Sequence, residues 1–405
     1  MHQQGTSLTT QQANIIHRID DVSSEAWNLC ANPGEKINHN PFLRHEFLSA
    51  LENSKSVSSE TGWQPFHMVL KEEKEILGTV PLYLKNHSQG EYVFDHSWAD
   101  ALHRAGGNYY PKLQASIPFT PATGRRLLTK YPSSEIESLL LKYCLALCEQ
   151  INVSSFHFTF LTQTQWNLAG EHGFLKRIDQ QFHWKNAGYN SFNDFLSDLS
   201  TKKRKNIRRE RKESLKNGIT VEWLSGGDIT ESHWDAFYDF YTDTGARKWG
   251  SPYLNRDFFS LITNTMAEDI LLIMCKRNRK YVAGALNFIG GNTLFGRNWG
   301  CNEYHPFLHF ETCYYQAIDF AIEKKLGKVE AGAQGEHKIA RGYLPEKTYS
   351  GHWIKHEDFR AAVSRFLEDE RGYVEQDLEY RKQHTPFNSN VNLEKFTGPS
   401  SINLS

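Results

Sequence analysis

The sequence lacks any long hydrophobic run, any excess of charge of one sign and any paired cysteine motif. Its longest aliphatic stretch, residues 270–275, is far shorter than the roughly 18 to 20 residues that a membrane-spanning helix needs. The N-terminus shows no basic segment followed by an apolar one, which is the pattern of a secretory signal. Because 46 basic and 47 acidic residues nearly cancel, we expect a protein that does not coat nucleic acid with its whole surface, although a local basic patch remains open. We expect it to be cytoplasmic, as the unpaired cysteines discussed next indicate.

Cysteine and histidine also form none of the common catalytic or metal-binding patterns. None of the six cysteines belongs to a C-x-x-C pair, and the 18 histidines include no H-E-x-x-H motif. We therefore expect reduced thiols that serve as small apolar residues, and no metal site. Phosphate loops of the Walker type and the G-x-G-x-x-G dinucleotide fingerprint are missing as well, so we expect neither nucleotide hydrolysis nor nicotinamide chemistry.

What the sequence does contain is a repeated pattern of strands. Residues 67–84 and 270–288 each read as an apolar strand, a charged turn and a second strand with an interior glycine, Gly78 or Gly284. Hydrophobic residues make up 39% of the chain, enough for two cores. A repeat of this size predicts a duplicated domain.

Each copy continues in the same order, with helices before the strand pair and a helix crossing to another strand after it. This order predicts an α+β fold with two domains, at residues 14–186 and 187–387. We expect the last helix, residues 358–382, to pack on the second copy. The polar ends, residues 1–13 and 388–405, are predicted to be disordered tails. The expected elements are helices 24–31, 44–52, 135–150, 231–244, 256–266 and 311–325, and strands 113–119, 155–161, 293–299 and 328–331.

The most unusual segment is a basic helix at residues 201–216, which we expect Ser200 or Thr201 to cap. Cations crowd its first turn, where the helix dipole disfavours them, so local stability is sacrificed there, as often happens at functional sites. One interpretation is a phosphate- or RNA-binding surface, and the other is a solvated helix face that happens to be basic. The candidate phosphate-binding residues are Lys202, Lys203, Arg204, Lys205, Arg208 and Arg209.

A second candidate segment is the polar, glycine-rich loop that follows the strand at 328–331. We expect Glu336 or His337, together with Glu330, to be catalytic, since one of them would take a proton from an attacking amine. Its three glycines would allow the backbone to approach a ligand closely. The alternative is a capping network that fixes an irregular loop. The candidate substrate-binding residues of the loop are Gln334, Lys338 and Arg341, the last two as carboxylate or phosphate ligands.

Polar residues inside apolar strands add two further candidate sites. For those in the second copy, one interpretation is that they line a cleft, and the other is that Arg297 pairs with an acid in the core. In the first copy they form a polar-aromatic pocket or belong to a hydrophobic satellite core. The candidate substrate-binding residues are Asn287, Arg297 and Trp299 in the second copy, and Asp95, Trp98, Asp100 and Lys112 in the first.

The order of elements in each half resembles the GNAT acyltransferase fold, present twice. Over residues 14–388 the chain also resembles the FemAB-like bacterial proteins. The segments that carry this resemblance are Trp-Ala-Asp, Tyr-Tyr-Pro-Lys-Leu, Pro-Phe-Thr-Pro, Lys-Lys-Arg-Lys-Asn-Ile-Arg-Arg-Glu and Glu-Ala-Gly-Ala-Gln-Gly-Glu-His-Lys. The resemblance implies tandem GNAT-like domains, each with a mixed, largely antiparallel sheet flanked by helices. It also implies transfer of an amino acid from aminoacyl-tRNA to an amine of a cell-wall precursor.

Three functions follow as hypotheses. The leading one is an acyl or aminoacyl transferase that uses aminoacyl-tRNA as donor and a cell-wall precursor or peptide amine as acceptor. The alternative is an acyl-CoA-dependent N-acetyltransferase, although residues 298–309 do not fit the Q/R-x-x-G-x-G/A loop that holds pyrophosphate in such enzymes. The third is a non-catalytic protein that binds RNA or an anionic glycan. In none of these do we expect a tightly bound cofactor.

Overall fold

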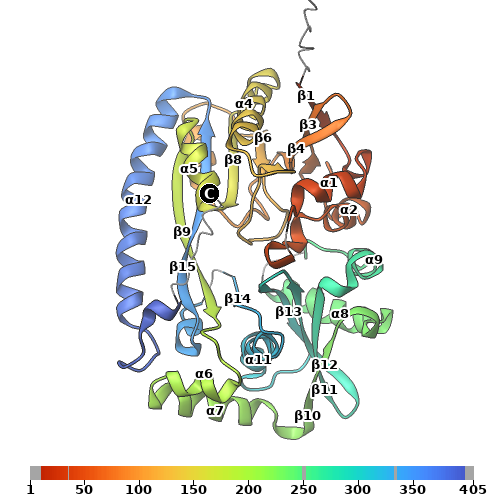
Figure 1. Ribbon diagram of the computed structural model, residues 1–405, viewed down its shortest axis with the longest axis vertical. Coiled ribbons are helices and arrows are strands. Elements are labelled where there is room, and N and C mark those ends of the chain that lie inside the picture. The colour runs from red at the N-terminus through yellow and green to blue at the C-terminus, as the bar shows by residue number, and fades with distance from the viewer. Residues whose placement is uncertain (1–10, 35, 249–251, 333–334, 397–405) are drawn as a thin grey trace, which may run out of the picture. The chain divides into compact units, whose positions relative to one another are not determined.

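The computed structural model describes residues 11–34, 36–248, 252–332 and 335–396, and its ribbon is drawn in Figure 1. The chain forms two compact units. Unit 1 takes its described residues from Met1–Glu35, Phe42–Ile178 and Thr348–Arg371, and unit 2 takes its own from Lys36–Pro41, Asp179–Lys347 and Gly372–Ser405. Among the helices of the described residues, none has the length and apolar character needed to cross a membrane.

Unit 1 contains two sheets and a helical cover. The smaller sheet has the order β1-β3-β4-β7, and the larger one runs β2-β5-β6-β8-β15, where β15 spans Leu344–Ile354. β6 and β8 are parallel, whereas the other pairs are antiparallel. The elements are β1 (Gln11–Ile16), α1 (Ser24–Ala31), α2 (His45–Asn53), β2 (Trp63–Pro65), β3 (His67–Glu72), β4 (Glu75–Val80), β5 (Leu82–Lys85), α3 (His96–Arg104), β6 (Lys112–Ala115), β7 (Leu128–Thr129), α4 (Ser134–Gln150), β8 (Ser155–Leu161) and α5 (Gln163–Glu171).

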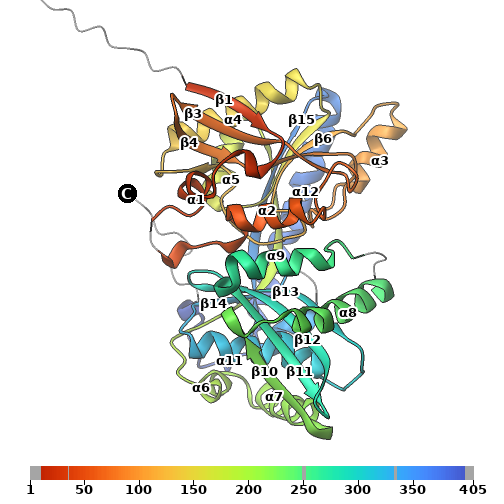
Figure 2. The ribbon, with the colours of Figure 1, turned by 90° about the vertical axis from the view of Figure 1, so that its right-hand side faces the viewer.

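Unit 2 contains one sheet with the order β10-β11-β12-β13-β14-β9. β13 and β14 are its parallel pair. α8 and α11 cover opposite faces of this sheet (Figure 2). The elements are β9 (Leu175–Lys185), α6 (Phe192–Asp198), α7 (Thr201–Ser214), β10 (Ile219–Leu224), α8 (Glu231–Lys248), α9 (Arg256–Met266), β11 (Ile270–Arg277), β12 (Lys280–Ile289), β13 (Thr293–Cys301), α10 (Leu308–Phe310), the π-helical turn η7 (Glu311–Tyr315), α11 (Gln316–Glu323), β14 (Lys328–Glu330), the 3-10 helix η8 (Glu336–Arg341) and β15 (Leu344–Ile354).

The repeated glycine has the same purpose in both units. A Cβ at Gly78 would lie 2.9 Å from Leu140 of α4, and one at Gly284 would lie 3.1 Å from Phe237 of α8. Both distances are shorter than an ordinary carbon–carbon contact, so each glycine lets a helix lie close against its strand. The predicted α+β class and the duplicated arrangement, with largely antiparallel sheets flanked by helices, are confirmed.

The units do not divide the chain where residues 14–186 and 187–387 were expected to. β9 follows α5 of unit 1, yet its second half lies in unit 2, where Trp184 pairs with Val329 of β14. β15 follows η8 of unit 2, yet its second half lies in unit 1, where Trp353 pairs with Phe156 of β8. Each repeat thus gives its last strand to the other unit, which a linear reading of the sequence does not reveal.

The last helix and the polar ends also differ from expectation. The first part of α12 (Glu357–Gln383) belongs to unit 1, where Val363 and Leu367 pack with Trp98, whereas the expectation that this helix packs on the second copy holds only for its part from Gly372 onward, which belongs to unit 2. Residues 11–13, expected in a disordered tail, form β1 with β3. At the other end Phe396, also expected in a tail, is buried against Phe387. In both places a few apolar or strand-forming residues suffice to anchor a polar segment.

Candidate functional site

The parallel strands of unit 2 separate after a short pairing. Thr293 lies opposite Lys328 and Phe295 opposite Glu330, where β14 ends while β13 continues to Cys301. A β-bulge between Leu286 and Asn287 of β12 lies at the same level. Beyond Phe295, in the part of the chain that the structure describes, β13 pairs only with β12. Alternate residues of its remaining length therefore direct backbone N–H and C=O groups toward an open edge.

The three polar residues predicted in this meander lie differently. Asn287 is buried, and its side-chain amide donates to the carbonyl of Ala285 (3.3 Å) and more weakly to that of Leu271, so it supports the bulge from inside. Arg297 and Trp299 are half-buried on the open part of β13. The positive charge of Arg297 also lowers the pKa of Glu330, which agrees with the interpretation that Arg297 pairs with an acid in the core.

Glu330 is held as a buried anion at the point where the strands separate. Burial opposes its ionisation, but Lys328 and His183 outweigh it, so the pKa of Glu330 lies below its usual value. The Lys328 ammonium is 2.6 Å from one carboxylate oxygen, and the other oxygen has no hydrogen-bond partner among the described residues. His183, its cross-strand neighbour on β9, is buried, and burial lowers the pKa of this imidazole to about 4. The pair is thus an anion beside a neutral imidazole.

The loop helix η8 presents an imidazole. Nε2 of His337 lies 3.0 Å from the Tyr314 hydroxyl, and its ring packs on Phe310. Burial and the nearby Arg341 and Lys338 lower the pKa of His337, so the ring is neutral at pH 7. Tyr314 belongs to the π-helical turn η7, a type of distortion that recurs at functional sites. Glu336 begins η8, but its side chain lies outside the described residues, as does the whole of Gln334.

Lys338 and Arg341 hold the loop from within. The Lys338 ammonium donates to the Gly332 carbonyl (3.0 Å), and burial lowers the pKa of this lysine to about 8. Arg341 donates to the His337 carbonyl (2.7 Å) and to Glu210 of α7 (2.8 Å), and it stacks on Phe310. These contacts are what the capping-network interpretation expects.

The glycines of this loop are explained by the loop itself. Gly335 and Gly342 flank η8 with φ of 106° and 89°, in the left-handed region that glycine enters without strain. A Cβ at Gly342 would also lie 2.6 Å from Phe195. Turn conformation and packing therefore require glycine at these two positions, without any need for a ligand.

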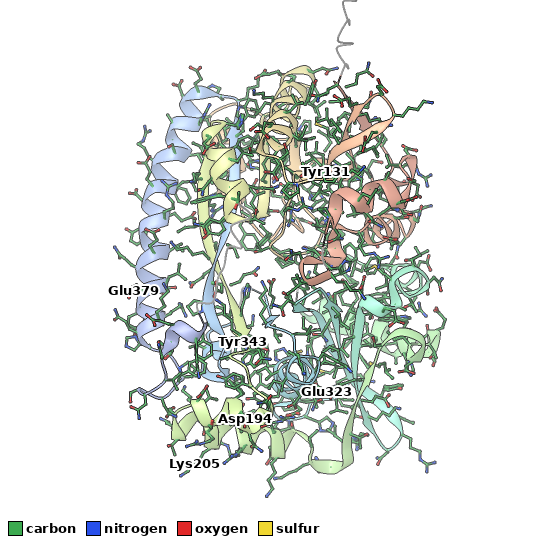
Figure 3. All side chains as sticks on the ribbon, viewed as in Figure 1. Tyr131, Asp194, Lys205, Glu323, Tyr343 and Glu379 are labelled. Atoms are coloured by element: carbon green, nitrogen blue, oxygen red, sulfur yellow. The ribbon has the colours of Figure 1, made fainter. Side chains whose placement is uncertain are left out.

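The basic helix α7 packs through a narrow face and exposes its charge. Only Ile207, Glu210 and Ser214 are buried, and Arg211 is bound to Glu311 (2.9 Å) and Asp319 (2.6 Å). Figure 3 marks Lys205 on the outer side of the helix. The expected side-chain cap is wrong, because Ser200 makes no capping hydrogen bond. The cations that have no acidic partner among the described residues are Lys202, Lys203, Arg204, Lys205, Arg208, Arg209 and Lys212.

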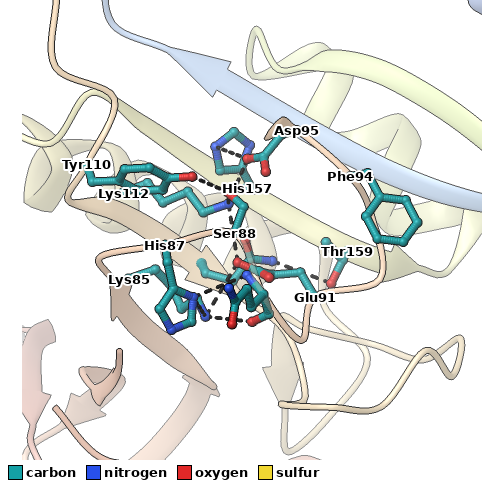
Figure 4. Close-up of polar contacts among 12 residues, drawn as sticks. Lys85, His87, Ser88, Glu91, Phe94, Asp95, Tyr110, Lys112, His157 and Thr159 are labelled. Carbon is teal, nitrogen blue, oxygen red and sulfur yellow. Dashed lines mark hydrogen bonds and ion pairs between the residues drawn. The ribbon is translucent and has the colours of Figure 1, made fainter. Parts of the chain in front are cut away.

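Unit 1 brings together a second set of polar residues, shown in Figure 4. The Lys112 ammonium donates to Asp95 (2.6 Å) and Ser88 (2.8 Å) and lies 3.3 Å from Glu91. The Lys85 ammonium lies 3.5 Å from the same Glu91 oxygen and above the ring of Trp63. All four charged side chains are nearly inaccessible, from 0% exposed for Lys85 to 4% for Glu91. We call Lys85, Glu91, Asp95 and Lys112 the buried ion cluster.

Burial sets the protonation of this region. It lowers the pKa of Lys85 to about 7, although Glu91 opposes the shift. Burial likewise disfavours charge on Lys112, but Asp95 and Glu91 outweigh it and raise the pKa of Lys112. His157 lies beside the cluster, and burial lowers its pKa to about 3. Its Nδ1 is 2.8 Å from Nδ1 of His352, whose pKa is also far below the usual value, so two neutral imidazoles share one hydrogen bond.

Of the four candidate substrate-binding residues in the first copy, three lie in or beside the buried ion cluster and one lies away from it. Asp95 and Lys112 are ion-paired, and Trp98 packs edge-on against His352, whereas Asp100 is exposed on α3 outside the cluster. The structure also adds residues that sequence reasoning missed. Their only signal was a polar residue in a stretch that is otherwise buried, and most of their partners lie far away in the chain. These residues are Lys85, Glu91, His157, His352, His183, Glu210 and Tyr314.

Comparison with known proteins agrees with this architecture. The FemAB-like family model, described as peptidoglycan biosynthesis/recognition, matches residues 18–389. The crystal structure of FemX is similar with a TM-score of 0.52 at 12% identity, over 87% of this chain and 100% of that chain. The C-terminal domain of a putative lysylphosphatidylglycerol synthetase from Agrobacterium fabrum is similar with a TM-score of 0.50 at 9% identity, over 85% and 94%. At these identities the two structures show a shared fold. Among curated proteins, no sequence is significantly similar.

Proposed function

The chain belongs to the FemAB-like family, and we propose that it transfers an acyl or aminoacyl group to an amine of a cell-wall precursor or peptide. The observation that carries this proposal is the open edge of β13 in the same unit as the neutral imidazole of His337. Family membership supports a role in peptidoglycan chemistry. The open edge and the imidazole supply the two groups that acyl transfer to nitrogen requires.

The reaction assigns a role to each group. Backbone N–H groups of residues 297–299 bind the carbonyl oxygen of the donor ester and stabilise the charge that develops on it. The amine nitrogen attacks the carbonyl carbon, a C–N bond forms, and the ester C–O bond breaks. If Nε2–H of His337 donates to the Tyr314 oxygen, Nδ1 is free to take the proton from the amine and to return it to the leaving oxygen. Glu330 adds a fixed negative charge near the attacking nitrogen.

The basic helix supports aminoacyl-tRNA as donor. Seven cations of α7 have no acidic partner in the described chain, so they are available to phosphates. Glu210 of the same helix binds Arg341 of η8, which ties the cationic surface to the loop that carries His337. We propose that Lys202, Lys203, Arg204, Lys205, Arg208 and Arg209 bind the phosphate backbone. Lys338, Arg341 and Trp299 would border the bound aminoacyl end.

An acyl-CoA donor is the alternative, and one observation disfavours it. A pyrophosphate in a GNAT enzyme binds the backbone of the loop before the helix that follows the open strand. In this chain that loop contains Glu303, whose pKa is lowered to about 2 by hydrogen bonds from Arg277 and His305. Because Arg277 and His305 are already bound to this carboxylate, neither is free to bind a pyrophosphate.

The test supplies tRNA charged with a radiolabelled amino acid, together with a soluble cell-wall precursor as acceptor. We expect label in the acceptor with the native protein and with His103→Ala, a control at an exposed histidine of α3, but not with His337→Ala. Absence of transfer from every charged tRNA to every precursor contradicts the proposal. Micromolar binding of acetyl-CoA by calorimetry would favour the acyl-CoA alternative instead. Salt-sensitive RNA or anionic-glycan binding without transfer, and a phenotype that survives the His337 change, would favour a non-catalytic binder.

A further inference from the structure

The loop between β5 and α3 in unit 1 alternates buried acids with exposed rings. Glu91 and Asp95 point inward to the buried ion cluster. Between them Tyr92 and Phe94 are 40% and 60% exposed, and His96 is exposed directly after them. This segment, which bends at residues 91–93, therefore has its acids fixed on the inner side and its rings exposed to water.

The inward face holds this segment firmly. Both acids contact Lys112, and Lys85 donates to the backbone carbonyl of Gln89 (2.9 Å). Arg177, itself bound to Glu370 through two 2.7 Å hydrogen bonds, donates to the carbonyl of Phe94 (2.8 Å). The backbone at each end of the ring-bearing stretch is thus tied to buried or paired cations, as Figure 4 shows for the acids and lysines.

The outward face is strained and only partly packed. Tyr92 adopts a φ of 58°, in the left-handed region where a bulky side chain is rare. Strain of this kind persists only where surrounding contacts impose it, and it concentrates at ligand-binding sites. Phe94 stacks on His96 at a ring distance of 6.2 Å, and in Figure 4 its ring lies on the far side of the loop from Lys112. Packing within the loop thus leaves most of the Phe94 ring in water.

We propose that Tyr92, Phe94 and His96 form a binding surface for the pyranose ring of an N-acetylated amino sugar. The electron-rich face of an aromatic ring attracts the weakly positive C–H groups that line one face of a pyranose. Exposed Ser97 and Asp100 on the first turns of α3 supply partners for sugar hydroxyl and amide groups. The inference rests on the proposed function, since peptidoglycan is built from such sugars.

Other occupants fit this surface less well. Two rings on one loop offer far less area than the roughly 1,200–2,000 Å² of a stable protein–protein interface. A nucleic acid would require cations, whereas the nearby lysines 85 and 112 are buried and paired. A small ring-shaped ligand with an apolar face and polar edges is the remaining match. It can come from the glycan polymer or from a nucleotide-linked precursor, which share this sugar.

The test is saturation-transfer NMR with the N-acetylglucosamine tetramer and, separately, with UDP-N-acetylglucosamine. We expect millimolar binding by the native protein, an affinity about fivefold weaker in Phe94→Ala, and affinity retained in Phe94→Trp, because stacking on one ring supplies about that much. Tyr131→Ala is the matched control, because Tyr131 is a 69% exposed ring elsewhere in unit 1 (Figure 3). Binding of the tetramer alone points to the polymer, and binding of both points to the shared sugar. No binding of either, or equal weakening in Tyr131→Ala, overturns the inference.

A second measurement separates this inference from the proposed function. In the transfer assay, Phe94→Ala should raise the KM for an acceptor that carries the sugar and leave kcat unchanged. With a peptide acceptor that has no sugar, neither constant should change. Sugar binding without any transfer would contradict only the proposed function. Transfer in which Phe94→Ala affects both acceptors equally would contradict only the sugar-binding surface.

Discussion

The two units treat the end of their parallel strand pair in opposite ways. In unit 1, residues 116–120 follow β6 beyond its pairing with β8, and all five are buried. In unit 2, residues 296–299 follow the same point of β13, and all four are only half-buried. The same order of elements thus gives one filled edge and one open edge. Because chemistry requires access, we assign the proposed reaction to unit 2.

The charged residues of the two units follow the same division. Unit 1 keeps its ion cluster out of water and uses it to fix a loop, whereas unit 2 leaves seven cations of α7 without acidic partners among the described residues. Under the proposed function, the first copy of the fold has a structural role and the second copy carries the reacting groups. The following changes test that difference, from the largest expected effect to the smallest.

The sharpest test removes the proposed base, His337. We expect His337→Ala to lower kcat for transfer by about 10²–10⁴-fold, the range for loss of a general base. Tyr314→Phe removes only the hydroxyl that contacts Nε2 and should cost less than His337→Ala. Thermal unfolding of both variants should match the native protein. Undiminished kcat in His337→Ala would mean that the acceptor or Glu330 handles the proton.

Breaking the buried ion cluster should instead lower the free energy of unfolding. Lys112→Met leaves Asp95 and Glu91 buried with too little positive charge, and we expect a loss of about 3–5 kcal/mol in the free energy of unfolding. Urea titration measures the change. Lys130→Met, at an exposed ion pair with Glu75 in the same unit, is the control and should cost less than about 1 kcal/mol. Equal losses in the two variants would show that the buried ion cluster stabilises unit 1 no more than an exposed ion pair does.

The neutral histidines of unit 1 predict acid sensitivity. The pKa of His157 is about 3 in the folded state and near 6.5 when unfolded, so between these values the unfolded state binds more protons. Stability should therefore fall as the pH drops from 6.5 towards 3, and Asp95, whose pKa is lowered, adds to the loss below pH 4. His157→Gln should flatten the dependence of unfolding free energy on pH between 4 and 6. An unchanged slope would contradict the buried neutral state.

The exposed cations of α7 should make RNA binding depend on the salt concentration. We expect Lys202→Ala with Lys205→Ala to weaken RNA binding and to lower the log–log salt slope by about one for each phosphate that is no longer neutralised. Lys325→Ala, an exposed lysine after α11 in the same unit, should leave the slope unchanged. Filter binding between 50 and 200 mM salt, roughly the range in which phosphate binding dominates, measures both. Equal slopes in all variants would support the solvated-face interpretation.

The smallest expected effect concerns the charge beside the base. Lys338 helps to lower the pKa of His337, after the larger effect of burial. Lys338→Met should therefore raise that pKa and move the acid limb of the pH–rate profile to higher pH. The Gly332 carbonyl then loses its partner, so unfolding is measured in parallel. A profile that does not move would remove His337 as the titrating group.

Local pattern predicted much of this fold. Helices α1, α4 and α9 and the β11–β12 hairpin lie within a residue or two of expectation, because caps, turns and apolar periodicity are local properties. The second strand of the pair expected at 67–84 is instead divided, since β4 ends at Val80 and β5 (Leu82–Lys85) joins the other sheet of unit 1. β9 and β15 escaped prediction, since their partners are chosen by the other repeat. For the same reason the site was only partly found. His337 and Glu330 stood out in a polar segment, but His183 and Tyr314 gain their meaning only from distant neighbours.

The exchange of last strands has a consequence for any attempt to isolate one half. A chain cut after residue 186 would leave β8 without β15, and the remaining piece would leave β14 without β9. Each fragment would present bare hydrogen-bonding groups along a sheet margin, a common start of aggregation. Each repeat therefore needs a strand from the other repeat to complete its sheet, and we expect neither fragment to fold properly without the other.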